Sequence, residues 1–486
     1  MPQLRDSGTR SLHATEPVPS AEMDGFCRIF GVETEYGVAV TGAERPVDAG
    51  QVAMTMFQPI VSRSRSTNTY LANGSRLYLD VGSHPEYATA EARDPREALA
   101  QDLAGEHVMR NLALKAQRKL RESYGAHATI HVFKNNVDSA GHAFGCHENY
   151  LVRRFVPLET IEHQLLPFLI TRQLYTGAGR MTPGGFQITQ RADFLDEAVS
   201  SATTRSRPMV NTRDEPHADP DSFRRLHVII GDSNRSQWST WMKLAVTHLV
   251  LCAIEDAFRH GTPSGFEQYA FADPAAANRT VSRFLDNPHA ELTLESGESV
   301  SALGLQRRYY AAVKAFIETH GDALAGSLPA TTIDTIMGEW SRVLDALERG
   351  AYDALADRVD WAAKKRLFDA LKRRRPDVTF AQMEQLELDY HDIANGRLYG
   401  SLVARNQMRE LLTGDNVEYA VHNPPTDTRA ALRGRFVDAA LNVGAQFSAD
   451  WTHLTLTAPE RREAILLDPF EAEPTLGFEQ LMEALN

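Results

Sequence analysis

The 486-residue sequence predicts an α+β fold, with a large domain in which a sheet is backed by helices and a small C-terminal α/β domain. Between residues 27 and 232, several segments alternate apolar and polar side chains, which is the period of a half-buried strand. From Gln237 to about residue 394, the apolar residues recur at helical spacing instead. Asn423-Pro424-Pro425 then marks a boundary, because two prolines in a row break regular structure.

Three segments follow from this pattern. Residues 1–25 are polar and lack an apolar core, so we expect a disordered N-terminal extension rather than a signal peptide. Residues 26–415 are expected to form the large domain, and residues 416–486 the small C-terminal domain.

The first strand, over residues 27–38, carries two carboxylates on one face. Phe30, Val32 and Tyr36 take one side, while Glu33 and Glu35 take the other. Such a pair repels itself unless cations lie between the two groups. Oxygen ligands favour hard ions, Mg²⁺ before Zn²⁺. The strand therefore indicates a metal site, with two solvent-exposed glutamates as the ordinary alternative.

A second strand of the same kind begins at Arg76. Leu77, Leu79 and Val81 alternate with a cation, a phenol and a carboxylate, which are Arg76, Tyr78 and Asp80. Gly82-Ser83 and Pro85 then turn the chain, which next presents Glu86, Thr89 and Glu91. The alternative for this stretch is a solvated strand face. A helix over residues 52–65 precedes it, and Asp94-Pro95 starts another helix that runs to about Glu122.

Further strands are expected over residues 128–134, 146–152, 186–190 and 224–232. Neighbours on a strand point to opposite faces, so either His147 with Asn149, or Glu148 alone, reaches a shared site. His227 either faces that site or is a satisfied core histidine. Residues 200–219 form the longest loop-like segment, in which Arg205 and Arg207 suit phosphate or carboxylate recognition.

The remaining elements are mostly helical. Helices are expected over residues 241–258, 302–317, 332–347, 352–374, 380–394 and 428–444, with a closing strand over 449–456. The basic residues Lys364, Lys365, Arg366 and Lys372 to Arg375 form a helical face, which is either simply solvated or a docking patch for an acidic partner.

Composition excludes several classes of protein. A net charge of −13 argues against a general nucleic-acid binder. No window is apolar for long enough to span a membrane. The three separated cysteines, Cys27, Cys146 and Cys252, indicate a reducing cytoplasm without structural disulfides. Cys146 adjoins His147, so it is either a nucleophile or a small buried residue. The sequence holds no Walker A loop, Rossmann fingerprint or nucleophile elbow.

Four runs carry a family resemblance: Gly31-Val32-Glu33-Thr34-Glu35-Tyr36-Gly37, Leu77 to Glu91, Gly145-Cys146-His147-Glu148-Asn149-Tyr150-Leu151 and Ser200 to Asp219. They closely resemble the Pup–protein ligase family (proteasome accessory factor A), which is related to the carboxylate–amine ligases typified by glutamine synthetase and glutamate–cysteine ligase. The resemblance extends from about residue 27 to the end. It implies a glutamine synthetase-like catalytic domain over residues 26–415, with a curved, mainly antiparallel sheet whose polar concave face forms the site.

The family has a close relative, the Pup deamidase and depupylase, from which this chain differs in two places. The connection from Tyr36 to Arg76 is short, whereas the deamidase carries an extra loop there. Val81-Gly82-Ser83 precedes His84-Pro85-Glu86, which is the sequence motif of the ligase. Minor departures from the ligase pattern are Ala92-Arg93 and Thr176, at positions without an obvious chemical role.

The resemblance implies an ATP-dependent ligase that joins the side-chain carboxylate of the C-terminal glutamate of Pup to substrate lysine ε-amines. The reaction passes through a γ-glutamyl phosphate and marks proteins for proteasomal degradation. The expected cofactors are ATP and Mg²⁺. The expected partners are Pup, a small acidic disordered modifier, and lysine-bearing proteins, without nucleic acid or membrane.

By motif match, each site residue takes a role. Glu33, Tyr78 and Glu86 would hold Mg²⁺, with Tyr78 acting directly or through water and Glu35 as an addition. Arg76 and Thr89 would contact ATP, and Trp451 would pack near the nucleotide. Asp80 would be the base that deprotonates the lysine. Arg205 and Arg207 would hold phosphate or the Pup carboxylate, and His227 is a further candidate.

Three alternatives stay open at this point. The first is a Pup deamidase/depupylase, in which Asp80 activates water or acts as the nucleophile. The second is a small-molecule γ-glutamyl–amine ligase, and the third is a non-catalytic binding protein.

Overall fold

The structure is a computed structural model that describes residues 25–79, 84–138, 141–200, 208–458 and 460–485. Its central sheet has eight strands in the order β10-β11-β12-β7-β1-β5-β4-β3. These are β1 (Phe30–Glu35), β3 (Asn68–Tyr70), β4 (Arg76–Leu79), β5 (Pro85–Ala88), β7 (Cys146–Arg153), β10 (Glu197–Ser200), β11 (Pro208–Asn211) and β12 (Phe223–Val228). Every neighbouring pair is antiparallel except β10 and β11. The prediction of an α+β fold with a mainly antiparallel sheet is confirmed.

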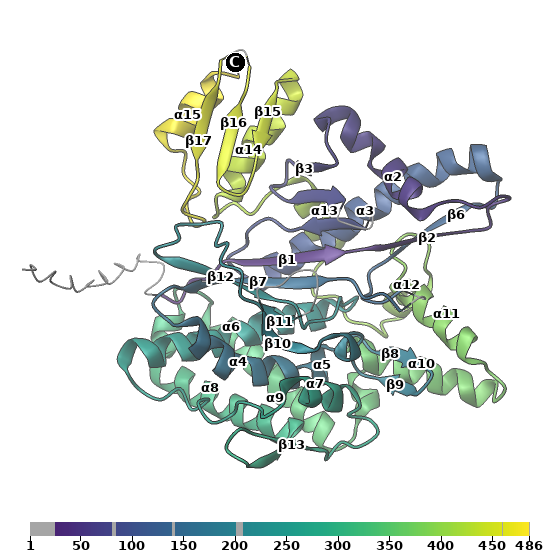
Figure 1. The fold of residues 1–486 in the computed structure, drawn as a ribbon, viewed down its shortest axis with the longest axis vertical. Coiled ribbons are helices and arrows are strands. Elements are labelled where there is room, and N and C mark those ends of the chain that lie inside the picture. The colour runs from purple at the N-terminus through teal and green to yellow at the C-terminus, as the bar shows by residue number, and fades with distance from the viewer. Residues whose placement is uncertain (1–24, 80–83, 139–140, 201–207, 459, 486) are drawn as a thin grey trace, which may run out of the picture.

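Helices cover the apolar face of this sheet. They are α4 (Leu158–Thr171), α5 (Gln173–Thr176), α6 (Gln237–His260), α8 (Ala302–Leu324) and α9 (Ala330–Glu348). Phe30, Val32, Tyr150 and Leu226 of the sheet join these helices in the largest apolar cluster. Every residue of α6 from Gln237 to Ala257 is buried, which explains the nearly continuous apolar run of this helix. Figure 1 shows β1, β7 and β12 between these helices and the yellow C-terminal unit.

A second apolar cluster lies under one end of the sheet. It is formed by β2 (Gly37–Thr41), β6 (Thr129–Phe133), α2 (Ala49–Ser64) and α3 (Pro95–Tyr124). The start of α3 is as predicted, because the Asp94 side chain accepts hydrogen bonds from the Arg96 and Glu97 amides.

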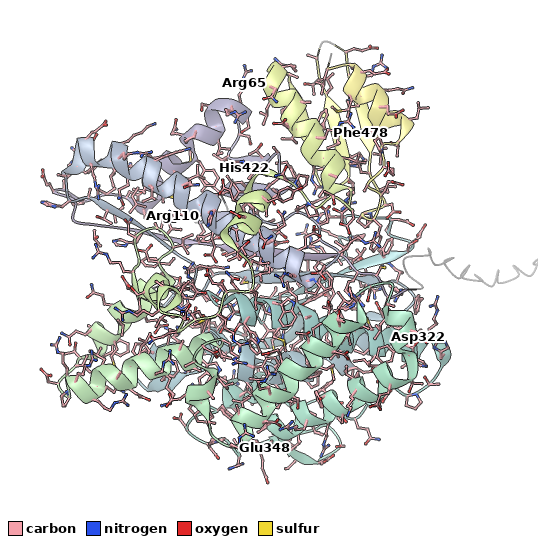
Figure 2. All side chains as sticks on the ribbon, turned by 180° about the vertical axis from the view of Figure 1, so that it is seen from behind. Arg65, Arg110, Asp322, Glu348, His422 and Phe478 are labelled. Atoms are coloured by element: carbon pink, nitrogen blue, oxygen red, sulfur yellow. The ribbon has the colours of Figure 1, made fainter. Side chains whose placement is uncertain are left out.

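The other elements surround these two layers. They are β8 (Arg180–Thr182), β9 (Gly185–Gln187), η1 (Ala192–Phe194), α7 (Pro274–Ser282), β13 (Glu291–Thr293), β14 (Ser299–Ser301), η2 (Tyr352–Leu355), α10 (Asp360–Arg374), α11 (Phe380–His391), α12 (Leu398–Ala404) and α13 (Gly414–His422). Figure 2 shows α13, labelled at His422, lying across α3, labelled at Arg110.

The C-terminal unit has a core of its own. It consists of α14 (Ala430–Val443), β15 (Phe447–Ala449), β16 (His453–Leu456), β17 (Arg462–Ile465) and α15 (Leu476–Glu483). The strands form a separate sheet in the order β15-β16-β17. Phe436, Leu454 and Phe478 are buried between this sheet and the two helices. The boundary between residues 415 and 416 stays a prediction, since α13 crosses it and packs against α3.

Three elements differ from the prediction. The helix expected over residues 352–374 is divided, because η2 is a 3-10 helix that ends at Leu355 and α10 begins only at Asp360. The closing strand over residues 449–456 is a hairpin, because Asp450 Oδ1 accepts hydrogen bonds of 2.7 Å from the Thr452 and His453 amides and turns the chain. Trp451 therefore lies in a tight turn between β15 and β16. The loop-like segment over residues 200–219 contains β11, whose Met209 and Val210 are buried in the sheet.

The predicted basic helical face is also only partly correct. Lys364 is buried, and its Nζ donates to Gly179 O at 2.6 Å and to Glu387 Oε1 at 3.1 Å. It therefore supports the packing of α10 against α11, whereas Lys372 to Arg375 are exposed. None of the helices in the described ranges has the length and apolar character that crossing a membrane requires.

Candidate active site

Carboxylates from two strands meet the phenol of a third on the polar face of the sheet. Glu35 of β1 lies directly opposite Glu86 of β5, and Glu86 lies opposite Tyr78 of β4. Directly paired residues share a face, with Cβ atoms about 5 Å apart. Glu33, two residues before Glu35, points the same way. The predicted metal ligands Glu33, Tyr78 and Glu86 are thus neighbours, and Glu35 is beside them.

Strands β7 and β12 add nitrogen groups around Glu33. His147 Nδ1 lies 3.3 Å from Glu33 Oε2, and Asn149 Nδ2 donates to Glu33 Oε1 at 3.0 Å. Arg225 Nη1 donates to Asn149 Oδ1 at 2.9 Å and lies 3.5 Å from Glu33 Oε1. Burial alone would raise the pKa of Glu33, but His147, His227 and Arg225 together hold it well below its usual value. Glu33 is therefore a carboxylate.

His147 also reduces the repulsion between the two glutamates of β1, because its ring lies between their carboxylates. Its Nδ1 faces Glu33, and its Nε2 lies 4.0 Å from Glu35 Oε1. Gly145 makes this approach possible, because a Cβ there would lie 2.4 Å from both Glu35 Oε1 and His147 Nε2. The pattern in which His147 and Asn149 face the site is the one observed. Glu148 points to the opposite side, where it pairs with Arg172 at 2.5 Å.

His227 faces the site as a neutral imidazole. It lies opposite Asn149 on the polar face, and its ring centroid is 4.8 Å from that of His147. Burial, reinforced by His147 and Arg225, lowers the pKa of His227 to about 3, although Glu33 opposes this. Its Nδ1 lies 2.7 Å from Arg225 Nη1. Since arginine can only donate, Nδ1 accepts and Nε2 carries the proton.

Arg76 fixes the ring of Tyr78. The guanidinium lies 4.2 Å from the centroid of the Tyr78 ring, and its Nε donates to Asn68 Oδ1 at 2.9 Å. Burial, with the charges of Glu86 and Glu33, holds the pKa of Tyr78 well above its usual value. Tyr78 is therefore a neutral phenol at physiological pH.

An apolar pocket adjoins this face. It is lined by Gly31 of β1, Leu151 of β7 and Ile29, which directly precedes β1, and Trp451 and Pro469 contribute from the C-terminal unit. Gly31 leaves the pocket open at the sheet, because it has no side chain on the polar face. The predicted residues Glu33, Thr89 and Trp451 also line the pocket, together with Arg225. Thr89 Oγ1 accepts a hydrogen bond of 3.0 Å from the Val32 amide, which leaves its hydroxyl hydrogen for a ligand.

Two groups of residues could hold a cation. Glu33, His147 and His227 have ligand atoms within 4.8 Å of one another. In that group, however, His227 offers a protonated Nε2 and His147 Nδ1 contacts Glu33. The oxygen group of Glu33, Glu86 and Tyr78, with Glu35 beside it, fits the preference of Mg²⁺ for carboxylate and neutral oxygen ligands.

The predicted residues Asp80, Arg205 and Arg207 lie outside the described residues. Arg225 and His217 line the pocket, yet sequence reasoning assigned neither of them a role. The alternation of Arg225 with His227 on one strand was the signal that could have found Arg225. His217 stands in an irregular segment, where no periodicity places a side chain.

A mainly antiparallel sheet whose carboxylate-rich face adjoins an apolar pocket fits a ligase of the carboxylate–amine class. The chain belongs to the Pup-ligase protein family, whose sequence model matches residues 28–455. A Pup–protein ligase of Bifidobacterium longum (strain NCC 2705) is 99% identical over 486 residues, covering 100% of both chains. One from Bifidobacterium dentium is 63% identical over 487 residues, again with 100% of both covered.

Two solved structures are similar throughout. The complex between the prokaryotic ubiquitin-like protein Pup and its ligase PafA has a TM-score of 0.85 and 36% identity, covering 96% of this chain and 93% of that chain. The Pup ligase PafA in complex with ADP has a TM-score of 0.78 and 36% identity, covering 92% of this chain and 97% of that chain.

Proposed function

We propose that this protein is an ATP-dependent ligase that joins the side-chain carboxylate of the C-terminal glutamate of Pup to lysine ε-amines of other proteins. The observation that carries the proposal is the meeting of Glu33, Tyr78 and Glu86 on one sheet face beside a pocket that Trp451 closes. Family membership and the similar structures with Pup and with ADP support the same activity.

The chemistry explains why ATP is needed. A carboxylate is a poor electrophile, and an amine displaces no leaving group from it. Transfer of the γ-phosphoryl group of ATP to the glutamate oxygen creates an acyl phosphate and ADP. Attack of the lysine nitrogen on the acyl carbon then forms the isopeptide bond and releases phosphate. Both steps gather negative charge on phosphate oxygens, which a site must neutralise.

The residues of the sheet face take different parts in neutralising this charge. Glu33, Glu86 and Tyr78, with Glu35 beside them, would hold Mg²⁺, which neutralises and orients phosphate oxygens. Arg76 holds the Tyr78 ring in place and contributes positive charge near the phosphates. We propose that Arg205 and Arg207 contact phosphate or the Pup carboxylate, on the basis of their residue type and their position in the segment before β11.

The pocket suits the base of the nucleotide. Ile29, Gly31 and Leu151 offer apolar surface, and Trp451 offers an aromatic ring. Thr89 stands between this pocket and the metal ligand Glu86 on the same chain segment, so its hydroxyl can donate to the ribose or to a phosphate.

Asp80 is proposed as the base for the incoming lysine. A lysine amine has a pKa near about 10.4, so nearly all of it is protonated at neutral pH. A carboxylate two residues beyond Tyr78 on the same strand pattern attracts the ammonium group and takes its proton. Asp80→Asn is expected to abolish conjugation while leaving ADP affinity within about twofold, because Asn keeps the size of the side chain.

One reaction tests the function. The full chain is incubated with ATP, Mg²⁺, Pup ending in glutamate and a lysine-bearing protein, and conjugates are read by a gel shift. The ligase proposal expects ATP-dependent conjugates. Rapid deamidation of glutamine-ended Pup without conjugation would establish the hydrolase instead. ATP turnover stimulated by amino acids without Pup would establish a small-molecule ligase, and no turnover under any condition a binding protein.

We propose the cytoplasm as the location, because the proposed reaction consumes ATP. All three cysteines are free in the structure, which is compatible with a reducing compartment.

A further inference from the structure

Glu91 lies at the end of the motif that carries Glu86 and Thr89. With Arg429 it lines the edge of the pocket, but it is neither one of the proposed metal ligands nor the proposed base. Its side chain is 8% exposed and is held between two arginines of the C-terminal unit. Arg429 Nε donates to Glu91 Oε1 at 2.8 Å, and Arg433 Nη1 donates to the same oxygen at 3.1 Å. Arg433 Nη2 also binds Glu91 Oε2. One carboxylate thus compensates two buried guanidinium groups.

Arg433 extends this cluster to Trp451. Its Nη1 donates to Trp451 O at 3.3 Å, and its guanidinium lies 4.9 Å from the Trp451 ring centroid. Its Nε and Nη2 both donate to Gly74 O, in the turn between β3 and β4. Tyr70 completes the packing, with its ring edge-to-face against Trp451 at 5.2 Å. The Trp451 indole is therefore held in place by the ion cluster as well as by its own hairpin.

Arg429 ties two further segments to the same carboxylate. Its Nη1 donates to Leu466 O at 2.8 Å, just after β17, and its Nη2 donates to His217 O at 2.5 Å. His217 belongs to the segment that borders the pocket, and its ring lies 6.2 Å from that of Trp451. Thr428 Oγ1 also donates to the main-chain oxygen Glu91 O at 3.0 Å, a bond that does not need the carboxylate. Through the two arginines, the Glu91 carboxylate is thus linked to Trp451 and to His217, which both line the pocket.

We propose that Glu91 is a positioning residue that acts through Arg433 and Arg429 to hold Trp451 at the nucleotide pocket, so that nucleotide affinity depends on this ion cluster. The inference rests on the proposed contact between Trp451 and the nucleotide. Without the carboxylate, two buried guanidinium groups repel each other, and the hairpin that carries Trp451 loses one of its attachments to the segment after β5.

A matched control exists elsewhere in the molecule. Glu255 on α6 is likewise buried between two arginines, at 2.7 Å from Arg28 Nη2 and 3.0 Å from Arg153 Nη1. This cluster lies on the helical side of the sheet and contains neither Trp451 nor a neighbour of it. Glu255→Gln therefore removes the same kind of charge at a place that does not hold the indole.

The experiment is a double-mutant cycle on the full chain, with ADP affinity measured by isothermal titration calorimetry. Glu91→Gln and Trp451→Ala are each expected to weaken ADP binding by about tenfold, and the double variant no further than Trp451→Ala alone. Glu255→Gln is expected to lower the melting temperature and to leave ADP affinity within about twofold. In conjugation assays, Glu91→Gln should raise the KM for ATP while kcat at saturating ATP stays within about twofold.

Wild-type ADP affinity in Glu91→Gln would overturn the inference, as would losses that multiply in the double variant. If Glu91→Gln does not fold, Arg433→Lys gives the second reading, because it keeps the charge but cannot bond Glu91, Gly74 and Trp451 together; unchanged ADP affinity there would also overturn it. Failure of the proposed function is separate, since it would appear as a wild-type chain that binds ADP but forms no conjugates.

Discussion

Glu33 on β1 and His147 on β7 lie directly opposite each other, with His147 Nδ1 3.3 Å from Glu33 Oε2. Asn149 donates to the other oxygen of the same carboxylate. These contacts hold Glu33 ionised and fix its orientation toward the face that carries Tyr78 and Glu86. A carboxylate in this state is prepared to bind a divalent cation without rearrangement.

Glu33→Gln is therefore expected to reduce conjugation by more than about 100-fold, because the neutral amide cannot replace a carboxylate ligand. The Mg²⁺ concentration needed for half-maximal ADP binding should rise in the same variant. Glu35→Gln is the matched control, since Glu35 lies 4.0 Å from His147 and is only an additional candidate ligand. Equal losses in both variants would contradict the separate role of Glu33.

Tyr78→Phe separates the contribution of the Tyr78 hydroxyl group from that of its aromatic ring. The substitution keeps the aromatic surface on which Arg76 stacks at 4.2 Å, but removes the oxygen beside Glu86. We expect ADP affinity at saturating Mg²⁺ within about twofold of wild type, and an apparent Mg²⁺ affinity lowered by about tenfold. Both are measured by titrating ADP and Mg²⁺ in turn. Tyr78→Ala, which also removes the stacking surface, should lose ADP affinity as well; if Phe and Ala behave alike, the oxygen has no separate role.

Much of this site could be predicted because strands repeat every two residues. Once Glu33 and Tyr78 were placed on polar strand faces, the pairing of β1 with β5 and of β5 with β4 brought their side chains together. The family resemblance supplied the metal-binding role predicted for these residues, whereas the pairing of the strands comes from the structure. Neither source placed Arg225, because its role depends on β12 lying next to β7. The alternation with His227 indicates which face Arg225 takes, but the adjacency of β12 and β7 is a long-range feature that the local sequence does not show.

The turn at Trp451 shows a second limit of prediction from sequence, in which a local interaction rather than a long-range one was missed. The segment from Ala449 to Leu456 alternates well enough to predict one strand, but Asp450 caps the two amides that follow it and turns the chain instead. Local hydrogen bonding by a short polar side chain competes with the strand here. The burial of Lys364 was likewise not predicted. It stands in a run of charged residues, and the sequence does not show that Glu387 is its partner.

Arg225→Lys tests a residue that only the structure placed. Arg225 reaches Asn149 Oδ1, His227 Nδ1 and Glu215 O at once, and a lysine ammonium cannot span these three acceptors. We expect kcat for conjugation to fall by at least about tenfold with the melting temperature nearly unchanged, because charge is kept but orientation is lost. Steady-state kinetics and a thermal melt measure this. Wild-type kinetics in Arg225→Lys would show that only positive charge matters at this position.

The last prediction concerns pH and the attachment of the C-terminal unit. Burial would raise the pKa of Glu91, but Arg433 and Arg429 lower it to about 2, from 4.5. A carboxyl group with a depressed pKa stabilises the folded state at pH values above its pKa in the unfolded state. This stabilisation is therefore complete above about pH 4.5 and is lost as the pH falls toward about 2.

The shift corresponds to about 3 kcal/mol, since one pKa unit is about 1.4 kcal/mol. The difference in unfolding free energy between wild type and Glu91→Gln should therefore shrink by about 1 kcal/mol between pH 7 and about pH 3.5, measured by urea unfolding. The comparison with Glu91→Gln cancels the titration of all other carboxyl groups, so a difference that does not change with pH would mean that Glu91 is not held ionised by these two arginines.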